Sequence, residues 1–309
     1  MLTDFYAGLA IVIILIFIGF SLSKIKIITD EGVKFLSNLI LTVALPVAFF
    51  NSFPDEFSFA DFRLFLWGLV SCVVILSLLI LLSQVLFSKK IIKNNNYEYK
   101  FAFAFNNTSF IGYPLVSMAF GQDGLIAYAG FMLPWVIALF TYGIWLFNDN
   151  YTWKDTLKGF LNPNVVGIIL GAVFFIVGIR LPAIINQTVG LIAGLTTPLA
   201  LLCIGFMLSE AKLKVLFKRW QVVFVCLTQL TIPPIFTWAL LKMVGAPSVV
   251  ISVLVLMQAL PTAATLGLFN KKYKNTESEA GEIVTLSTLL AGITVPILIY
   301  FLIGNILSI

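Results

Sequence analysis

Long apolar runs separated by short polar loops constrain this chain more than any other feature. Hydrophobic residues fill 60% of its 309 positions and charged residues only 11%, whereas a soluble domain is about a quarter charged. A membrane-spanning helix needs about 20 mainly apolar residues, and continuous runs favour helices over a barrel, whose strands alternate. We therefore predict an all-α integral membrane protein with ten transmembrane helices. They are placed near residues 5–23, 32–50, 62–87, 99–120, 124–147, 163–179, 183–208, 220–242, 247–270 and 282–305.

The distribution of Lys and Arg predicts the orientation of these helices. Of the 19 basic residues, Arg63, Arg180 and Lys242 fall on one side of the layout, and the other 16 fall on the opposite side. The side rich in basic residues is normally cytoplasmic. We therefore expect an integral protein of the bacterial cytoplasmic membrane with both termini outside. The net charge of +5 then reflects topology, and we predict no nucleic-acid partner.

Few residues could support catalysis or hold a metal. The chain has no histidine, and Cys72, Cys203 and Cys226 lie far apart in apolar stretches. Lys100 and Glu282 are predicted to be the deepest charged residues, both near the membrane interface, so no carboxylate for proton coupling is visible in mid-membrane. Without a base, a metal cluster or an acid pair, we predict no enzymatic activity, no cofactor and no metal.

The ten helices divide into two halves. We predict a first five-helix repeat at residues 1–148, a cytoplasmic linker at 149–162 and a second five-helix repeat at 163–309. Because each half holds an odd number of helices, the second half is inverted relative to the first.

Proline positions relate the two halves. Pro46 and Pro198 occupy the second and seventh predicted helices, and Pro114 and Pro261 occupy the fourth and ninth. Proline lacks an amide hydrogen and crowds the carbonyl four residues earlier. We therefore expect residues 108–113 to unwind before Pro114, and Pro261 to release the carbonyl of Met257. Such paired interruptions at bilayer depth are typical of a transporter's substrate site.

Amides and hydroxyls beside these prolines could bind a small organic anion if the two breaks cross near the membrane midplane. The predicted substrate-binding residues are Asn106, Asn107, Thr108, Ser109, Gly112, Pro114, Gln258, Pro261, Thr262 and Thr265. A second set could hold a coupling ion or support the site: Asn38, Thr196, Thr197 and Pro198. The alternative role for each amide is a hydrogen bond between helices, worth about 0.6 kcal/mol on average. The sequence leaves open which of Asn106 and Asn107 faces the substrate.

Glycine pairs predict where helices pack closely. Gly167 and Gly171 are four residues apart, as are Gly190 and Gly194. Small residues at this spacing let two backbones approach within a membrane. We therefore predict close-packed faces at both pairs.

Several motifs make the chain similar to a known family. They are residues 106–115, Phe120 with Gly121, Gly124 with Leu125, residues 197–200, residues 205–208 and residues 260–263. The chain resembles the auxin efflux carrier family of membrane transport proteins along its whole length. The bacterial members are malate or malonate permeases, and the plant members export auxin.

This resemblance implies an inverted repeat of five helices, crossing broken helices 4 and 9, a scaffold half, a transport half and often a homodimer. It also implies that an asparagine before the first crossover proline contacts the substrate carboxylate, a position that Asn106 or Asn107 would match. Residues 148–162 are too short for the long regulatory loop of the plant exporters.

Together these features predict a secondary transporter, or permease, for a small organic anion such as a carboxylate, working by alternating access. Facilitated or exchange transport is favoured over proton symport. A non-transporting membrane receptor on the same fold and an anion channel are the alternatives. The sequence leaves the substrate, the direction of transport, the coupling ion and the oligomeric state open.

Overall fold

The protein is helical throughout the part of the chain that its computed structural model describes. The described residues are 2–54, 56, 58–88, 96–210, 219–274 and 279–298, without the side chains of residues 2–9 and 158. They form two compact units, and each unit draws on three separate parts of the chain. Unit 1 comprises Met1–Leu69, Ser109–Val136 and Phe160–Ala211, and unit 2 comprises Val70–Thr108, Ile137–Gly159 and Lys212–Ile309.

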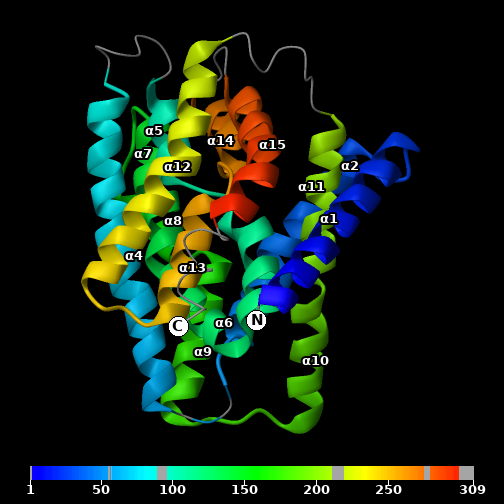
Figure 1. Cartoon of the computed structure of the whole chain (residues 1–309). Helices are drawn as coiled ribbons and strands as arrows, with labels where there is room; N and C mark the ends of the chain where they lie inside the picture. The colour runs from blue at the N-terminus through cyan, green and yellow to red at the C-terminus, as the bar shows by residue number, and fades with distance from the viewer. Residues whose placement is uncertain are drawn as a thin grey trace. The chain divides into compact units, whose positions relative to one another are not determined.

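The elements can be followed along the chain in Figure 1. Those of unit 1 are α1 (Leu2–Lys24), α2 (Asp30–Leu39), η1 (Ile40–Ala44), α3 (Leu45–Phe50), the start of α4 (Phe59–Leu86), nearly all of η2 (Thr108–Gly112) and α6 (Tyr113–Ala138), α9 (Pro163–Val177), α10 (Ala183–Gly194) and α11 (Thr196–Ser209). Those of unit 2 are the rest of α4, α5 (Asn96–Ala104), η3 (Leu139–Gly143), α7 (Ile144–Phe147), α8 (Trp153–Phe160), α12 (Trp220–Met243), α13 (Ser248–Ala259), α14 (Thr265–Phe269), η5 (Asn270–Lys274) and α15 (Ala280–Leu298). The η elements are π-helical turns.

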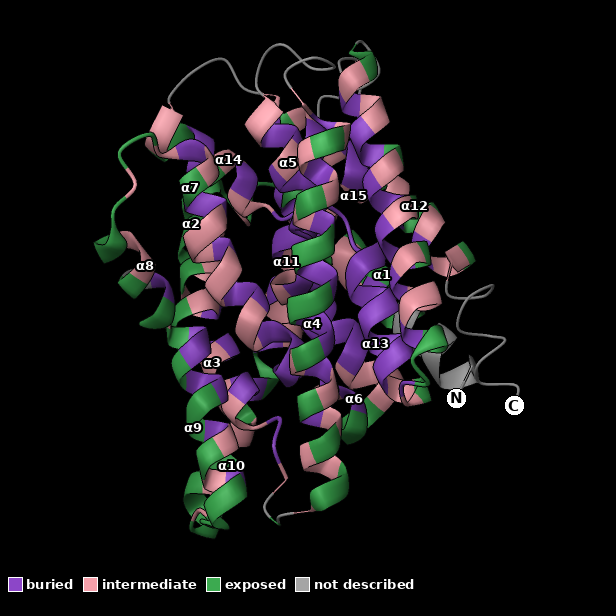
Figure 2. Ribbon diagram, turned by 90° about the vertical axis from the view of Figure 1, so that its left-hand side faces the viewer, coloured by how far each residue is buried: buried purple, intermediate pink, exposed green. Residues whose placement is uncertain are grey.

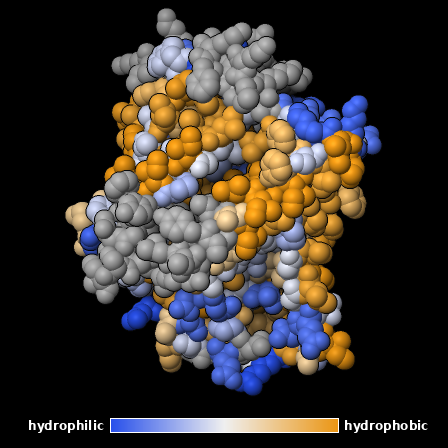
Figure 3. All heavy atoms as spheres, turned by 45° about the vertical axis from the view of Figure 1, so that its right-hand side comes forward, coloured by the Kyte–Doolittle hydropathy of each residue, from blue (hydrophilic) through white to orange (hydrophobic). Residues whose placement is uncertain are grey.

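Several helical segments are long and apolar enough to cross a membrane. The described residues contain six: Asp30–Phe50, Phe59–Leu86, Thr108–Phe147, Ala183–Ser209, Trp220–Met243 and Ala280–Leu298. Three shorter apolar helices are Ala10–Lys24, Pro163–Val177 and Ser248–Ala259. Apolar side chains cover much of the face seen in Figure 3, and α4 in Figure 2 combines buried residues with a broad exposed face. The predicted all-helical membrane class is therefore confirmed, while residues 299–305 of the last predicted span lie outside the described residues.

Capping residues explain where several helices begin and end. Thr29 precedes α2, and its hydroxyl accepts a hydrogen bond from the Gly32 amide. Asn162 caps α9 in the same way, with Pro163 as the first helical residue, a position where a missing amide hydrogen costs little. The same helix ends at Gly178, whose φ of 73° is left-handed and favours glycine.

A sharp change of direction lies within α6. Gly121 has a φ of 57° and a ψ of −145°, which are not helical values. The break lies between residues 120 and 124, where one predicted helix ends and the next begins.

Close approach of helices within unit 1 depends on glycine. A Cβ atom on Gly130 of α6 would overlap the Phe65 carbonyl oxygen of α4, and one on Gly205 of α11 would overlap the Ile16 carbonyl oxygen of α1. Gly167 similarly faces the Pro46 carbonyl oxygen. A β-carbon at any of these positions would force two backbones apart, because packed interiors leave no room for it.

The second predicted glycine pair packs differently from the first. Gly167 and Gly171 lie against residues 46–53, as predicted, but no described atom lies within 4 Å of a Cβ placed on Gly190 or Gly194. The prediction of a close-packed face on α10 is therefore wrong for the described structure, because both glycines point into open space.

We expect Gly130→Ala to destabilise the protein by about 1–3 kcal/mol, because the added methyl group requires the backbones of α4 and α6 to separate. Thermal unfolding of purified protein measures this as a lower melting temperature. Gly190→Ala is the matched control, since its methyl group meets no described atom. A melting temperature equal in the two variants would contradict the close approach described for α4 and α6.

Candidate functional site

Two helices of unit 2 are interrupted, and the interruptions pair with each other. Helix α5 ends at Ala104, and α13 ends at Ala259. Asn106 and Thr262 then form an antiparallel bridge. Within it the Asn107 amide donates to the Pro261 carbonyl at 2.6 Å, and the Ala263 amide donates to the Phe105 carbonyl at 2.9 Å. The backbone groups that the two helices release are therefore satisfied by each other.

The first interruption lies slightly earlier than predicted. Residues 105–107 leave the helix, whereas residues 108–112, which we expected to unwind, form the π-helical turn η2. Pro114 is the second residue of α6, where a missing amide hydrogen is tolerated. The extended segment therefore lies before the π-helical turn, not within it.

Asn106 connects the two interruptions through its side chain. Its Nδ2 donates to the carbonyl oxygens of Met257 at 2.9 Å and Gln258 at 3.1 Å, and to Gln258 Oε1 at 3.1 Å. The Met257 carbonyl, predicted to be released by Pro261, thus takes its hydrogen bond from another segment. Asn106 is only 1% exposed, so these bonds form away from solvent and leaving one unmade would be costly.

Gln229 of α12 completes this hydrogen-bond network, and sequence reasoning missed it. Its Nε2 donates to Asn106 Oδ1 at 2.9 Å and to the Leu260 carbonyl at 2.6 Å. Gln229 is fully buried. The sequence did not single it out, because α12 also contains Gln221 and three threonines, and the need of a buried amide for a partner does not show which amide is buried.

Ser287 of α15 was also missed. Its Oγ accepts a hydrogen bond of 3.2 Å from the Thr262 amide, while the Thr262 hydroxyl donates to the Ala102 carbonyl at 3.4 Å. A serine in an apolar helix gives too weak a signal for prediction, because serine often bonds its own helix. Ser287 does this as well, by donating to the Val284 carbonyl at 3.1 Å. The paired break, which we define as residues 105–107 with residues 260–263, is thus held by α12 and α15.

The predicted substrate residues divide between the two units. Unit 2 brings together Asn106, Asn107, Thr108, Gln258, Pro261 and Thr262 by the contacts above or by direct adjacency, and all six are buried. Thr265 begins α14, also in unit 2. Ser109, Gly112 and Pro114 belong to unit 1.

The second predicted set belongs entirely to unit 1. Asn38 lies in α2, and its carbonyl accepts a hydrogen bond from the Thr42 hydroxyl at 2.7 Å. Thr196, Thr197 and Pro198 open α11, a helix that contacts α2 and η1. Thr196 is fully buried, and its hydroxyl has no hydrogen-bond partner in the described structure.

A buried carboxylate lies at the start of α5. Glu98 is fully buried, accepts a hydrogen bond from Asn270 Nδ2 and accepts another from the Glu279 amide at 3.0 Å. The prediction that Lys100 and Glu282 are the deepest charges is therefore wrong with respect to burial, because Asn270 and the Glu279 backbone shelter Glu98. Lys100 instead donates to Gln84 Oε1 at 2.6 Å.

Glu279 lies just before α15 and interacts with charges of both signs. Its Oε1 is 2.6 Å from Arg219 Nη1. Burial, together with the neighbouring carboxylates of Glu98 and Glu282, raises the pKa of Glu279 to about 7. The carboxyl group therefore titrates near neutral pH.

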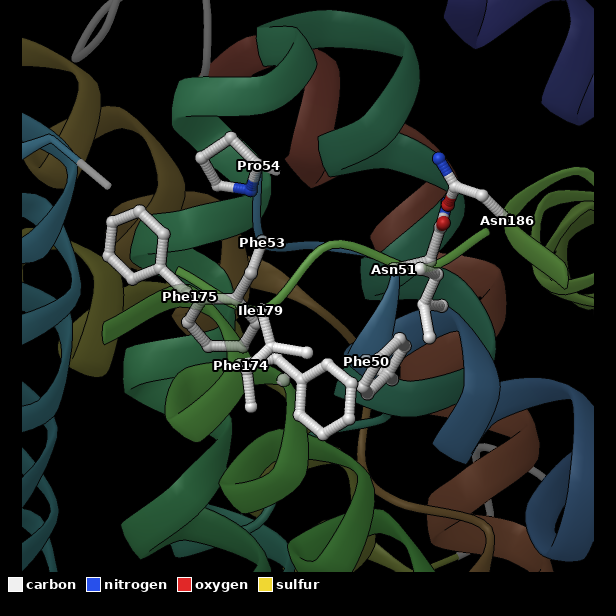
Figure 4. A pocket seen from close by; sticks show the side chains of 10 residues that line it. Phe50, Asn51, Phe53, Pro54, Phe174, Phe175, Ile179 and Asn186 are labelled. Carbon is white, nitrogen blue, oxygen red and sulfur yellow. The ribbon is translucent and has the colours of Figure 1, made fainter. Parts of the chain in front are cut away.

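A separate pocket lies within unit 1 (Figure 4). Phe50, Phe53, Phe174 and Phe175 dominate its lining, with the amides of Asn51 and Asn186 at the edge. Its cavity volume of about 30 Å³ holds roughly two water molecules. It is too small for an organic anion, so the paired break remains the stronger candidate.

We expect Asn106→Ala to destabilise the protein by at least about 2 kcal/mol, because it removes the Asn106 donor from buried carbonyl groups and one of the two acceptors of Gln229 Nε2. Thermal unfolding measures the change. Gln187→Ala, which removes an exposed amide from α10, is the matched control and leaves the melting temperature unchanged. An Asn106→Ala melting temperature equal to that of the control would disprove the structural role of the Asn106 side chain.

Glu279 predicts a pH-dependent stability. Its pKa lies near 7 in the folded protein against a usual value of 4.5, so the folded state binds more protons between these pH values. The stability contributed by this group is complete below pH 4.5 and is lost as the pH rises through 7. Melting temperatures measured at increasing pH therefore fall across this window, and Glu279→Gln flattens the curve. Glu56→Gln, which changes the exposed ion pair with Arg180, is the control, and its melting temperature should still fall as the pH rises.

Comparison with known proteins identifies the family. The family model described as "membrane transport protein" matches the chain twice, at residues 4–153 and 150–299. An uncharacterized transporter from Methanocaldococcus jannaschii is 24% identical over 265 residues, which cover 82% of this chain and 84% of that protein. The family is one of transporters, not of enzymes, and the two matches together cover nearly all of the sequence. The chain therefore belongs to the membrane transport protein family, which is the auxin efflux carrier family.

Proposed function

We propose that this protein is a secondary transporter that moves a small organic anion, a carboxylate, across the cytoplasmic membrane by alternating access. The paired break of unit 2 is the observation that carries this proposal. Interrupted helices at membrane depth are tolerated only against protein, water or a ligand, and transporters commonly bind their substrates at such interruptions.

The proposed architecture has ten spans in two inverted halves. The 40-residue segment Thr108–Phe147 would be about 60 Å long as a straight helix, twice the thickness of a bilayer core, and it is broken at Gly121. Counting it as two spans, with the five other long segments and the three shorter apolar helices, gives ten. The double match to one family model supports a repeat, with residues 1–148 and 163–309 as its two copies.

The proposed orientation puts the basic loops in the cytoplasm and both termini outside. It follows from the 16 basic residues on one side of the ten-span layout and from the positive-inside rule. The linker at residues 149–162 is then cytoplasmic.

The two adjacent asparagines take different roles in the proposed site. Asn106 Nδ2 has two hydrogens and three acceptors, and Asn106 Oδ1 accepts from Gln229. Its side chain has no donor to offer, so Asn106 acts as a structural brace. We assign carboxylate recognition to Asn107 and Thr108, with Thr262 and Thr265 on the opposite segment of the same unit.

Neutral dipoles suit such a substrate. Hydrogen bonds from amides and hydroxyls to a carboxylate are stronger than those between neutral groups, and they leave no buried positive charge when the substrate departs. Exit of a monoanion through an inside-negative membrane gains about 2.3 kcal/mol per 100 mV. Export therefore needs no coupling ion, and uptake proceeds by exchange.

Transport by purified protein in liposomes tests this assignment. We expect Asn107→Ala to weaken uptake of the active carboxylate roughly tenfold to a hundredfold, because a hydrogen bond to a charged group is worth about 1.5–3 kcal/mol. Thermal unfolding confirms that the variant is folded at the temperature of the assay. A panel of malate, malonate and monocarboxylates identifies the substrate. Gln187→Ala is the control for both measurements.

Two outcomes would contradict the proposal. Full activity of Asn107→Ala would show that the Asn107 side chain does not bind the substrate. If no carboxylate is transported but a carboxylate still stabilises the protein against unfolding, a receptor is favoured. Single-channel currents would favour an anion channel. Uptake driven by a pH gradient after collapse of the membrane potential would replace exchange with proton symport.

A further inference from the structure

Helix α8 has its apolar side chains on the outside. Trp153, Leu157 and Phe160 recur at the spacing of one helical face, and they are 68%, 47% and 48% exposed. Leu161, the first residue after the helix, is 75% exposed. Figure 2 shows α8 with exposed surface along it. Exposing apolar surface to water costs roughly 25 cal/mol for each Å². We therefore expect this face to be buried against another apolar surface.

The small and polar side of α8 is the side that contacts the protein. A Cβ on Gly159 would lie 3.2 Å from the Phe140 Cβ of η3. The Thr156 hydroxyl is 2.8 Å from the Tyr151 hydroxyl. The helix is therefore oriented by the protein so that its apolar face points outward.

The acidic and basic side chains of α8 differ in their surroundings. The Asp155 carboxylate accepts hydrogen bonds from the Thr152 amide at 3.1 Å and the Thr152 hydroxyl at 2.9 Å, so it is used in starting the helix. Lys154 is exposed, and Lys158 follows it after one helical turn in the sequence. Lys154 thus gives the flank beside the apolar face a positive charge.

We propose that α8 is an interfacial anchor whose apolar face enters the headgroup region of the bilayer while Lys154 binds the phosphates of anionic lipids. Amphipathic helices with Trp, Leu and Phe on one face and Lys on the other lie in this way at membrane surfaces. Trp145 of α7 is also 55% exposed and stacks on Tyr142 with the ring centroids 5.7 Å apart. Exposed tryptophans of this kind gather at membrane interfaces.

A bilayer fits this face better than a second protein copy does. Helix α8 has eight residues and is only about 12 Å long, which cannot supply the roughly 800 Å² per partner of a stable protein interface. A membrane is already adjacent, since the described residues contain six helical segments long and apolar enough to cross one. The division between the two units falls at Gly159 and Phe160, so the anchor lies on a covalent connection between them.

Spin labels on the two sides of α8 test the proposal in the full-length protein. The buried residues Cys72, Cys203 and Cys226 are first replaced by alanine, and Leu157→Cys and Lys154→Cys are then labelled separately. Nanodiscs contain either phosphatidylcholine alone or phosphatidylcholine with phosphatidylglycerol. Collision rates are measured with oxygen, which dissolves in lipid, and with a water-soluble nickel chelate. Thermal unfolding confirms that both labelled proteins are folded.

We expect the ratio of oxygen to nickel collisions to be severalfold higher at position 157 than at position 154, and to rise at 157 when phosphatidylglycerol is present. Lys154→Gln in the Leu157→Cys background should lower the ratio to its value in phosphatidylcholine alone. Water-like collision rates at both positions overturn the proposal. So do low rates with both reagents at 157, which indicate a covering protein, and so does a ratio independent of lipid charge. None of these outcomes depends on which substrate is transported.

Discussion

A chain that interrupts a helix within a membrane must provide partners for the backbone groups it releases, because lipid offers none. In unit 2 this requirement is met by bringing two interruptions together. The backbones at Asn106 and Thr262 form a bridge. The Asn106 side chain donates to the carbonyl oxygens of Met257 and Gln258, at the end of α13. Gln229 in turn donates a hydrogen bond to the side-chain oxygen of Asn106. The break is thus a defined structure, and its hydrogen bonds connect α5, α12 and α13.

This arrangement separates stability from recognition at neighbouring positions. Because the Asn106 amide is committed to carbonyl oxygens, it fixes the direction in which the chain leaves α5 and therefore the positions of Asn107 and Thr108. In the proposed transporter, those following residues meet the substrate from a backbone that needs no reorganisation. Preorganised dipoles of this kind are effective in sites from which water is excluded, because their orientation costs nothing at the moment of binding.

Much of the fold followed from sequence, and the reasons differ between its parts. Apolar runs and the prolines at 114 and 261 predicted the helices and both interruptions, because burial of the backbone in lipid and the chemistry of proline are local constraints. The close packing at Gly167 could be predicted, but the open space at Gly190 could not, because glycine spacing does not identify the partner helix. Gln229, Ser287 and the burial of Glu98 were missed for the same reason. Their partners are distant in sequence, and no local pattern marks them.

The distribution of charge within unit 2 bears on how the proposed site would work. Glu98 lies eight residues before Asn106, which corresponds to roughly a dozen Å along a helix. Its carboxylate accepts hydrogen bonds from Asn270 and from the Glu279 amide. The side chains described above as forming hydrogen bonds at the paired break are all neutral: Asn106, Gln229, Gln258, Thr262 and Ser287. An anion bound by these neutral side chains would keep its full charge during translocation. The membrane potential then acts directly on the substrate, and this makes electrogenic movement of the anion the natural consequence of a site built from dipoles.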